Sequence, residues 1–128
     1  MKWYEDPEYQ LMCEKAEEIQ EEKEFIYLGD WYFQGQAYLW TATPIYRETR
    51  VWLPSQEDLQ EMVSSDLRIK LFDSNPALMS LKLFYDRISQ NKYFWQFKTY
   101  NKLWLAFVYH ELYQKKWNPE SKKWEETK

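Results

Sequence analysis

The sequence is poor in glycine, cysteine and histidine, and each shortage excludes a class of site. Its two glycines, Gly29 and Gly35, cannot build the glycine-rich loop through which a backbone cradles a phosphate group. Its one cysteine, Cys13, excludes an internal disulfide and fits a reducing compartment. Its one histidine, His110, excludes a cluster of histidine and cysteine metal ligands, although carboxylates alone could still hold a hard cation. We therefore predict no bound metal and no cofactor.

Long apolar runs are also missing. The first ten residues, MKWYEDPEYQ, contain no apolar signal core. No run approaches the roughly 18 consecutive apolar residues that a membrane-spanning helix requires. These absences predict a cytoplasmic protein that makes no membrane contact.

Aromatic side chains, by contrast, are abundant. Among 128 residues there are eight Trp, eleven Tyr and seven Phe. This length predicts a single domain, residues 1–128, whose core is built largely from rings. Because a small core does not need so many rings, we expect some of them on the surface, where a contiguous group would mark a contact site.

The N-terminal segment is strongly acidic and predicts a surface helix. Asp6 followed by Pro7 has the pattern of an N-cap and a first helical residue, so a helix is expected over about residues 7–23, before an α+β body over about residues 25–128. Its apolar stripe is narrow, and the rest of its surface carries closely spaced carboxylates. These carboxylates form either a solvent-exposed face or a protein-binding surface whose negative electrostatic potential imitates that of a nucleic-acid backbone. The candidate protein-binding residues are Glu14, Glu17, Glu18, Glu21 and Glu22.

The remaining chain alternates short strand patterns with helical ones. Val51–Leu53 reads as a strand that ends at Pro54, and Ser55 then reads as the N-cap of a short helix. Further elements are expected along the chain: two short strands within 25–43, an extended segment at 68–72, a helix from Asn75–Pro76 to about Ser89, a strand at 92–100, a helix at 101–115, and a hairpin turning at Asn118–Pro119. This pattern predicts an α+β fold in which a small antiparallel sheet is covered by three to four helices.

Two features of this body bear on binding. The helix at 101–115 is apolar around its whole circumference, so it is either central or covered by a partner, and a homodimer is one way to cover it. The start of the helix after Ser55 could bind an anion, with Trp52 as a stacking wall and Trp95 as a second ring. The alternative is a capped helix and buried sheet rings.

Catalytic chemistry is not indicated by any arrangement of residues. His110 shares a helix face with apolar residues, and Cys13 has no basic neighbour to lower its pKa. We therefore assign no catalytic residue and expect a protein that is not an enzyme.

Two motifs resemble small uncharacterised proteins encoded by phages and prophages of Gram-positive bacteria. The first is W-L-P-x-Q-x-x-L-Q-E-M, which begins at Trp52. The second is L-W-L-A-F-V-x-x-E-x-Y-x-K-x-W-N, which begins at Leu103, and Trp124 closes the pattern. Together they cover roughly the C-terminal sixty per cent of the chain. The resemblance implies a phage origin and carries over no catalytic or binding residue.

A phage origin implies a function that acts on the host. Small phage proteins without enzymatic motifs commonly bind and inhibit a host defence component, as an anti-CRISPR protein does, and this is the function that the resemblance implies. The alternatives are a small-ligand binder that sequesters a nucleotide signal and a structural or interaction module. We expect a host defence protein as the partner and no direct binding of nucleic acid.

Overall fold

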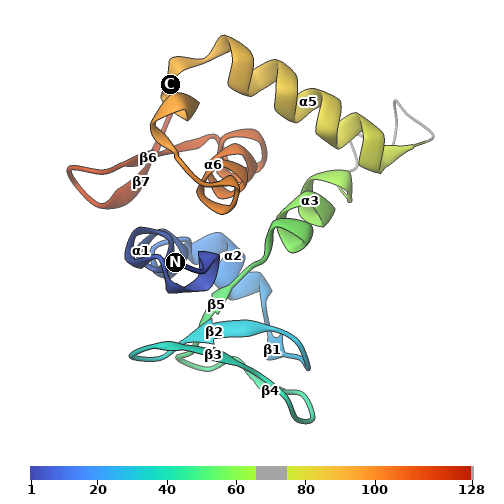
Figure 1. Ribbon diagram of the computed structural model, residues 1–128, viewed down its shortest axis with the longest axis vertical. Coiled ribbons are helices and arrows are strands. Elements are labelled where there is room, and N and C mark those ends of the chain that lie inside the picture. Colours follow the sequence, from blue (N-terminus) through green and yellow to red (C-terminus); the bar gives the residue numbers. More distant parts are fainter. Residues whose placement is uncertain (66–74, 128) are drawn as a thin grey trace. The chain divides into compact units, whose positions relative to one another are not determined.

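The computed structural model describes residues 1–65 and 75–127 (Figure 1). Helices and small antiparallel sheets are mixed along the chain, which confirms the predicted α+β class. The extended segment expected at 68–72 lies outside the described residues. The structure groups into two compact units, one formed by residues 1–55 with 117–125 and one by residues 56–116 with those from 126 onward.

The first unit begins with three short helices, η1 (Trp3–Glu5), α1 (Pro7–Glu14) and α2 (Glu17–Glu22). The predicted start of α1 is confirmed, because the Asp6 side chain accepts a hydrogen bond from the backbone N–H of Glu8 (3.0 Å) and Pro7 is the first helical residue. The buried face of α1 consists of Tyr9, Met12 and Cys13. The Tyr9 hydroxyl donates to the carbonyl oxygen of Pro54 (2.6 Å), which ties α1 to the end of a strand.

The prediction of one helix over residues 7–23 is wrong, because the chain breaks between α1 and α2. The carbonyl oxygen of Cys13 would accept the N–H of Glu17 in a continuous helix. Instead it accepts from the N–H of Ala16 (3.1 Å) and from the side-chain Nε2 of Gln20 (3.1 Å). The N–H of Glu17 turns to the carbonyl oxygen of Lys15. A buried side-chain amide thus takes the bond that would have continued the helix.

Two small antiparallel sheets follow in the first unit. One pairs β1 (Phe25–Ile26) with β4 (Ile45–Tyr46), and the other has the order β3–β2–β5, formed by Ala37–Leu39, Trp31–Phe33 and Val51–Leu53. The strand predicted at Val51–Leu53 is confirmed. The expectation of two strands within 25–43 is wrong, since three form there. Gly29 (φ +92°) and Gly35 (φ +79°) adopt left-handed conformations at which the chain turns on either side of β2.

The register of the three-stranded sheet sorts its side chains onto two faces. Tyr32 on β2 lies between Tyr38 on β3 and Trp52 on β5, so these three share one face. Trp31 lies between Leu39 and Leu53 on the opposite face. The rings of Trp31 and Tyr4 stack there with centroids 3.6 Å apart, and α1 contacts β5 on the same unit (Figure 1).

The outer edge of β5 is closed by a side chain rather than by a strand. The Gln20 amide accepts the backbone N–H of Trp52 (2.8 Å) through Oε1 and donates to the Trp52 carbonyl oxygen (2.8 Å) through Nε2. These are the two bonds that a neighbouring strand would make. Gln20 is buried, so its amide satisfies backbone groups that water does not reach.

A C-terminal hairpin of β6 (Lys115–Asn118) and β7 (Lys123–Glu126) confirms the predicted turn at Asn118–Pro119. The rings of Trp117 and Trp124 lie 5.3 Å apart, and both are buried. The indole Nε1 of Trp124 donates to the carbonyl oxygen of Met12 on α1 (3.0 Å). The last described strand is thereby attached to the first α-helix of the chain.

The second unit contains α3 (Gln56–Ser64), α5 (Pro76–Gln90), η2 (Lys92–Gln96) and α6 (Tyr100–Leu112). The predicted helix starts after Ser55 and at Pro76 are confirmed. Every residue of α6 from Trp104 to Tyr109 is buried, which makes α6 the central helix of this unit. Phe84 on α5 stacks on Trp104 with centroids 4.0 Å apart and planes 2° from parallel. The homodimer expected from the apolar helix stays a prediction, although burial of α6 removes the need for a partner to cover it.

The strand predicted at 92–100 is wrong, because these residues begin as the 3₁₀ helix η2. The Asn91 side chain caps η2 by accepting the backbone N–H of Tyr93 (3.0 Å). Phe94 and Phe97 are both buried, and they are three residues apart, which is one turn of a 3₁₀ helix. Trp95, predicted to share a sheet face with Phe97, is instead 56% exposed.

Candidate binding surface

The predicted acidic site is distributed over two helices of the first unit. Glu14 ends α1, and the other four glutamates lie on α2. Glu14, Glu17, Glu21 and Glu22 are exposed and Glu18 is half-buried. Because the chain breaks at Lys15–Ala16, these carboxylates do not form the single helical stripe that was expected.

The three residues predicted to bind a small ligand, Trp52, Ser55 and Trp95, differ in burial and do not all belong to the same unit. Trp52 is 7% exposed, so its ring lies within the first unit and is not an open stacking wall. Ser55 is half-buried directly before α3. Trp95 belongs to the second unit, where its Nε1 donates to the carbonyl oxygen of Ile88 (2.9 Å).

A surface that the sequence reasoning missed covers one face of the three-stranded sheet. We call it the aromatic–cationic face, and it consists of Lys23, Tyr27, Tyr32, Tyr38, Trp40, Arg50 and Trp52. The ring centroids of Tyr32 and Tyr38 are 5.4 Å apart in a stacked arrangement, and Trp40 meets Tyr32 edge-on at 6.4 Å. These separations are in the range that favours aromatic pairs. Strand pairing therefore holds the rings in fixed positions.

Lys23 connects this face to the turn before β2. Its Nζ lies 4.6 Å from the ring centre of Trp52 and 5.1 Å from that of Tyr27. The same Nζ forms an ion pair of 2.8 Å with Asp30, whose carboxylate also accepts the backbone N–H of Tyr27 (2.8 Å). A lysine held by two rings and a carboxylate has little of its usual freedom. The cation is therefore preorganised.

Arg50 provides a second cation on the same face. Its guanidinium lies 6.0 Å from the ring centre of Tyr32, and its Nη1 donates to the carbonyl oxygen of Tyr46 (3.1 Å). The Nε–H of Arg50 and the indole Nε1–H of Trp52 are buried without an acceptor among the described residues. Buried donors are nearly always paired in proteins. These two are the positions where a water or an acceptor from a partner would form new hydrogen bonds.

Exposed rings and apolar side chains extend the face along the same unit. Tyr46 is 60% exposed and stacks on Phe25 with centroids 4.7 Å apart, and Phe25 lies 6.0 Å from Tyr27. The large apolar side chains that are exposed on this part of the unit are Tyr27, Leu28, Tyr38 and Tyr46, whereas the exposed Leu39 lies on the opposite face of the sheet. The sequence carried one signal for this surface, because Arg50 directly precedes β5 and is two residues from Trp52, the spacing of side chains that share a face in extended chain.

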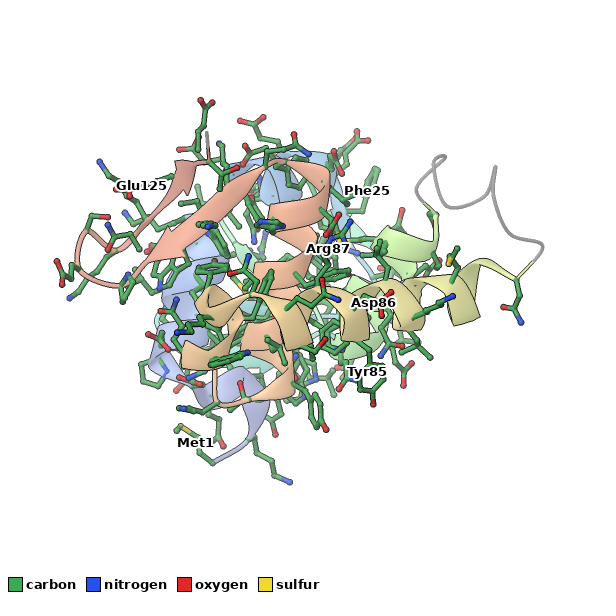
Figure 2. All side chains as sticks on the ribbon, turned by 90° about the horizontal axis from the view of Figure 1, so that it is seen from above. Met1, Phe25, Tyr85, Asp86, Arg87 and Glu125 are labelled. Carbon is green, nitrogen blue, oxygen red and sulfur yellow. The ribbon has the colours of Figure 1, made fainter. Side chains whose placement is uncertain are left out.

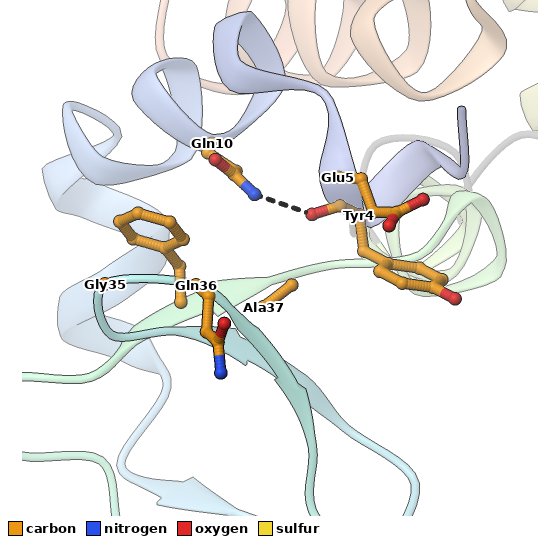
Figure 3. A pocket seen from close by; sticks show the side chains of 7 residues that line it. Tyr4, Glu5, Gln10, Gly35, Gln36 and Ala37 are labelled. Carbon is orange, nitrogen blue, oxygen red and sulfur yellow. Dashed lines mark hydrogen bonds between the residues drawn. The ribbon is translucent and has the colours of Figure 1, made fainter.

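Beside the sheet, a pocket of about 330 Å³ opens between η1, α1 and the β2–β3 turn (Figure 3). Its lining residues are Tyr4, Glu5, Gln10, Phe33, Gly35, Gln36 and Ala37. Gln10 donates through Nε2 to the carbonyl oxygen of Tyr4 (2.9 Å) at the pocket wall. Glu5 contributes a carboxylate, which disfavours an anionic ligand such as a nucleotide phosphate here.

The two residues considered for chemistry are both at least partly buried. Burial raises the pKa of the Cys13 thiol far above its ordinary value, so the thiol stays protonated. Partial burial lowers the pKa of His110, against the opposing effect of Glu111, whose carboxylate lies 3.8 Å from Nδ1. The His110 ring contacts Phe94 edge-on at 5.4 Å. Both side chains therefore have environments typical of packed residues.

The described residues contain no group of three or more His, Cys, Asp or Glu side chains arranged to hold a metal ion. Within the same residues, no helix has the length and apolar character needed to cross a membrane. In the comparisons with known proteins, no protein-family model, no curated protein and no solved structure matched the chain. The fold and the aromatic–cationic face together describe an α+β protein with a preorganised surface.

Proposed function

We propose that the chain is a non-enzymatic phage protein that binds and inhibits a component of a host defence system in the cytoplasm of the host cell, for example as an anti-CRISPR protein does. The observation that supports it is the group of exposed large apolar side chains on the first unit, Tyr27, Leu28, Tyr38 and Tyr46. Apolar side chains that gather on a surface and are bordered by polar groups mark protein-binding sites.

The composition of this surface favours a protein partner. Tyrosine, tryptophan and arginine are the residue types that dominate the binding energy of protein interfaces. Tyr46 stacked on Phe25, and Arg50 lying over Tyr32, are already held in place before a partner arrives. Rigid aromatic side chains lose little conformational entropy on binding.

The acidic residues of α2 provide a second element of recognition. Glu17, Glu21 and Glu22 are exposed, and effectors that act on nucleic acids present basic surfaces to their substrates. Carboxylates at the edge of an interface mainly accelerate association and select the partner. In this proposal the exposed aromatic residues contribute the affinity and the acidic residues contribute the steering.

The proposal is tested by phage plating on host cells that express this protein together with one defence system at a time. Efficiency of plating is expected to rise in the presence of one defence system and to stay unchanged in cells that lack it. Binding of the purified protein to the corresponding effector is then measured by calorimetry. If efficiency of plating does not rise with any of the host's defence systems, the proposal is refuted.

Variants of the exposed rings locate the surface. Tyr46→Ala is expected to weaken effector binding by about 2 kcal/mol, roughly thirtyfold, because a hot-spot tyrosine contributes about that much. The matched control is Tyr85→Ala, since Tyr85 is similarly exposed on α5 of the second unit (Figure 2). Equal affinity losses for both variants would contradict the assignment to the first unit.

A further inference from the structure

The three-stranded sheet has one unpaired edge, the outer edge of β3. Trp40 donates its backbone N–H to Asp30 (2.9 Å), and Tyr38 is the direct partner of Tyr32. Because successive backbone groups of a strand point in opposite directions, those of Ala37 and Leu39 point away from β2. Among residues 1–65 and 75–127, no hydrogen bond to the backbone of Ala37 or Leu39 is formed on that side.

The opposite edge of the same sheet is treated differently. There the Gln20 amide satisfies both backbone groups of Trp52. Natural sheets usually protect an open edge with charged side chains or proline on the edge strand. Residues 31–46 contain no Asp, Glu, Lys, Arg or His, so no charge protects the edge of β3. An uncharged open edge with exposed side chains is a site for addition of another strand.

We propose that β3 pairs with β3 of a second copy of this chain, forming a symmetric antiparallel dimer centred on Tyr38. In that register Tyr38 lies opposite Tyr38 of the other copy, and Ala37 lies opposite Leu39. The outward backbone groups of Ala37 and Leu39 then exchange hydrogen bonds with those of the other copy. The two three-stranded sheets become one continuous sheet.

The side chains fit this pairing on both faces. Tyr38 is 40% exposed and stacks on Tyr32, so pairing of the two copies extends the stack across the symmetry axis. Leu39 is 44% exposed, and in the dimer it lies beside the small Ala37 of the other copy. Ala37 borders the pocket of about 330 Å³, so the leucine enters a space that already exists (Figure 3).

The charge pattern of β3 permits pairing with a second copy. In a symmetric interface each side chain near the axis meets its own copy, and like charges directly opposite one another are destabilising. A strand without charges has no such repulsion. The dimer concerns a surface different from α6, and it does not depend on the proposed function, because it is measured on the purified protein alone.

The mass of the full chain in solution is the first test. Sedimentation equilibrium across a concentration series is expected to show a transition from 16.0 kDa to twice that mass. In the dimer, hydrogen exchange of the Ala37 and Leu39 amides should slow as concentration rises, while the Tyr38 amide, which faces β2, stays protected throughout. A monomer at every concentration, or exchange at Ala37 and Leu39 that does not depend on concentration, would overturn the proposal.

A charge-swap experiment tests the register. Tyr38→Lys and Tyr38→Glu each place like charges opposite one another in the dimer, and each is expected to raise its dissociation constant by about fivefold or more. Mixing the two variants pairs opposite charges and is expected to restore dimers of mixed composition. Tyr100→Lys, the same change at a more exposed tyrosine of the second unit, should leave the dissociation constant unchanged. Circular dichroism melting confirms that each variant is folded, and unaltered dimerisation of both Tyr38 variants would rule this interface out.

Discussion

Replacement of Gln20 by alanine tests whether a side-chain amide closes the sheet of the first unit. The substitution removes the acceptor for the N–H of Trp52 and the donor to the carbonyl oxygens of Trp52 and Cys13. Each buried backbone group left without a partner costs about 1–3 kcal/mol, and partial access of water reduces the sum. We expect a loss of about 2–4 kcal/mol in the free energy of unfolding, a large fraction of the 5–15 kcal/mol typical of natural domains.

Urea denaturation monitored by tryptophan fluorescence measures this loss. With a slope of about 1–3 kcal/mol per molar urea, the transition midpoint should fall by about 1–3 M. Gln34→Ala, at an exposed turn position of the same unit, is the matched control and should change the stability by less than about 0.5 kcal/mol. Equal midpoints for the two variants would refute the reasoning.

Gln20→Glu refines the same test through pH. Its carboxyl group keeps the acceptor for Trp52, but the second oxygen would face two carbonyl oxygens unless it is protonated. The pKa in the folded protein is therefore expected to lie above the unfolded value of about 4.3. The stability of this variant should be greatest below the unfolded pKa and should decline as pH rises through the folded pKa. A urea midpoint that rises with pH would contradict this sign.

Two further predictions concern the second unit. Trp104→Ala should lower the free energy of unfolding by about 3–5 kcal/mol, because Trp104 is buried against Phe84. Trp95→Ala, at a largely exposed ring, should lower it far less, and the urea midpoints of the two variants test the difference. Glu111→Gln should lower the pKa of His110 further, because the Glu111 carboxylate opposes the effect of burial, and titration by NMR checks this. The pKa of His110 in the folded protein lies below the ordinary 6.5, so the contribution of His110 to the free energy of unfolding is present above pH 6.5 and declines as the pH falls below it. A pKa above 6.5 in the folded protein would contradict this prediction.

Local rules predicted the helix starts well because caps depend on residues close in sequence. Asp6 and Asn75 each stand directly before a helix whose first residue is the following proline, as the pattern of a cap and a proline indicates. The same rules failed for the helix over 7–23. The bond that ends α1 comes from the Gln20 amide, whose other partner, Trp52, is 32 residues away. No local pattern contains that contact.

The error at 92–100 has a different cause. The alternation of Tyr93, Trp95 and Phe97 suggested a strand, but Asn91 supplies a cap and the buried pair is Phe94 with Phe97. In a chain with so many rings, apolar residues occur at two-residue and three-residue spacings at once. Periodicity therefore does not choose between a strand and a 3₁₀ helix here.

The aromatic–cationic face was out of reach of the sequence for a related reason. Its cations, Lys23 and Arg50, come from segments that are far apart in the sequence and meet only in the folded chain, for example through Arg47, which donates to the carbonyl oxygens of both residues. The strand expected at Val51–Leu53 did not identify Tyr32 as the ring beside Trp52. A surface formed by several short strands becomes visible only when their register is known.

The closure of β5 by Gln20 also limits the size of the assembly that the proposed pairing of β3 would form. A sheet with a single open edge pairs once and then presents no further edge, so growth stops at two copies. A sheet with two open edges accepts a new copy at each end and has no natural limit to its length. Opening the β5 edge would therefore convert a finite assembly into a fibre-forming one. In the proposed dimer, this one buried amide therefore prevents growth beyond two copies.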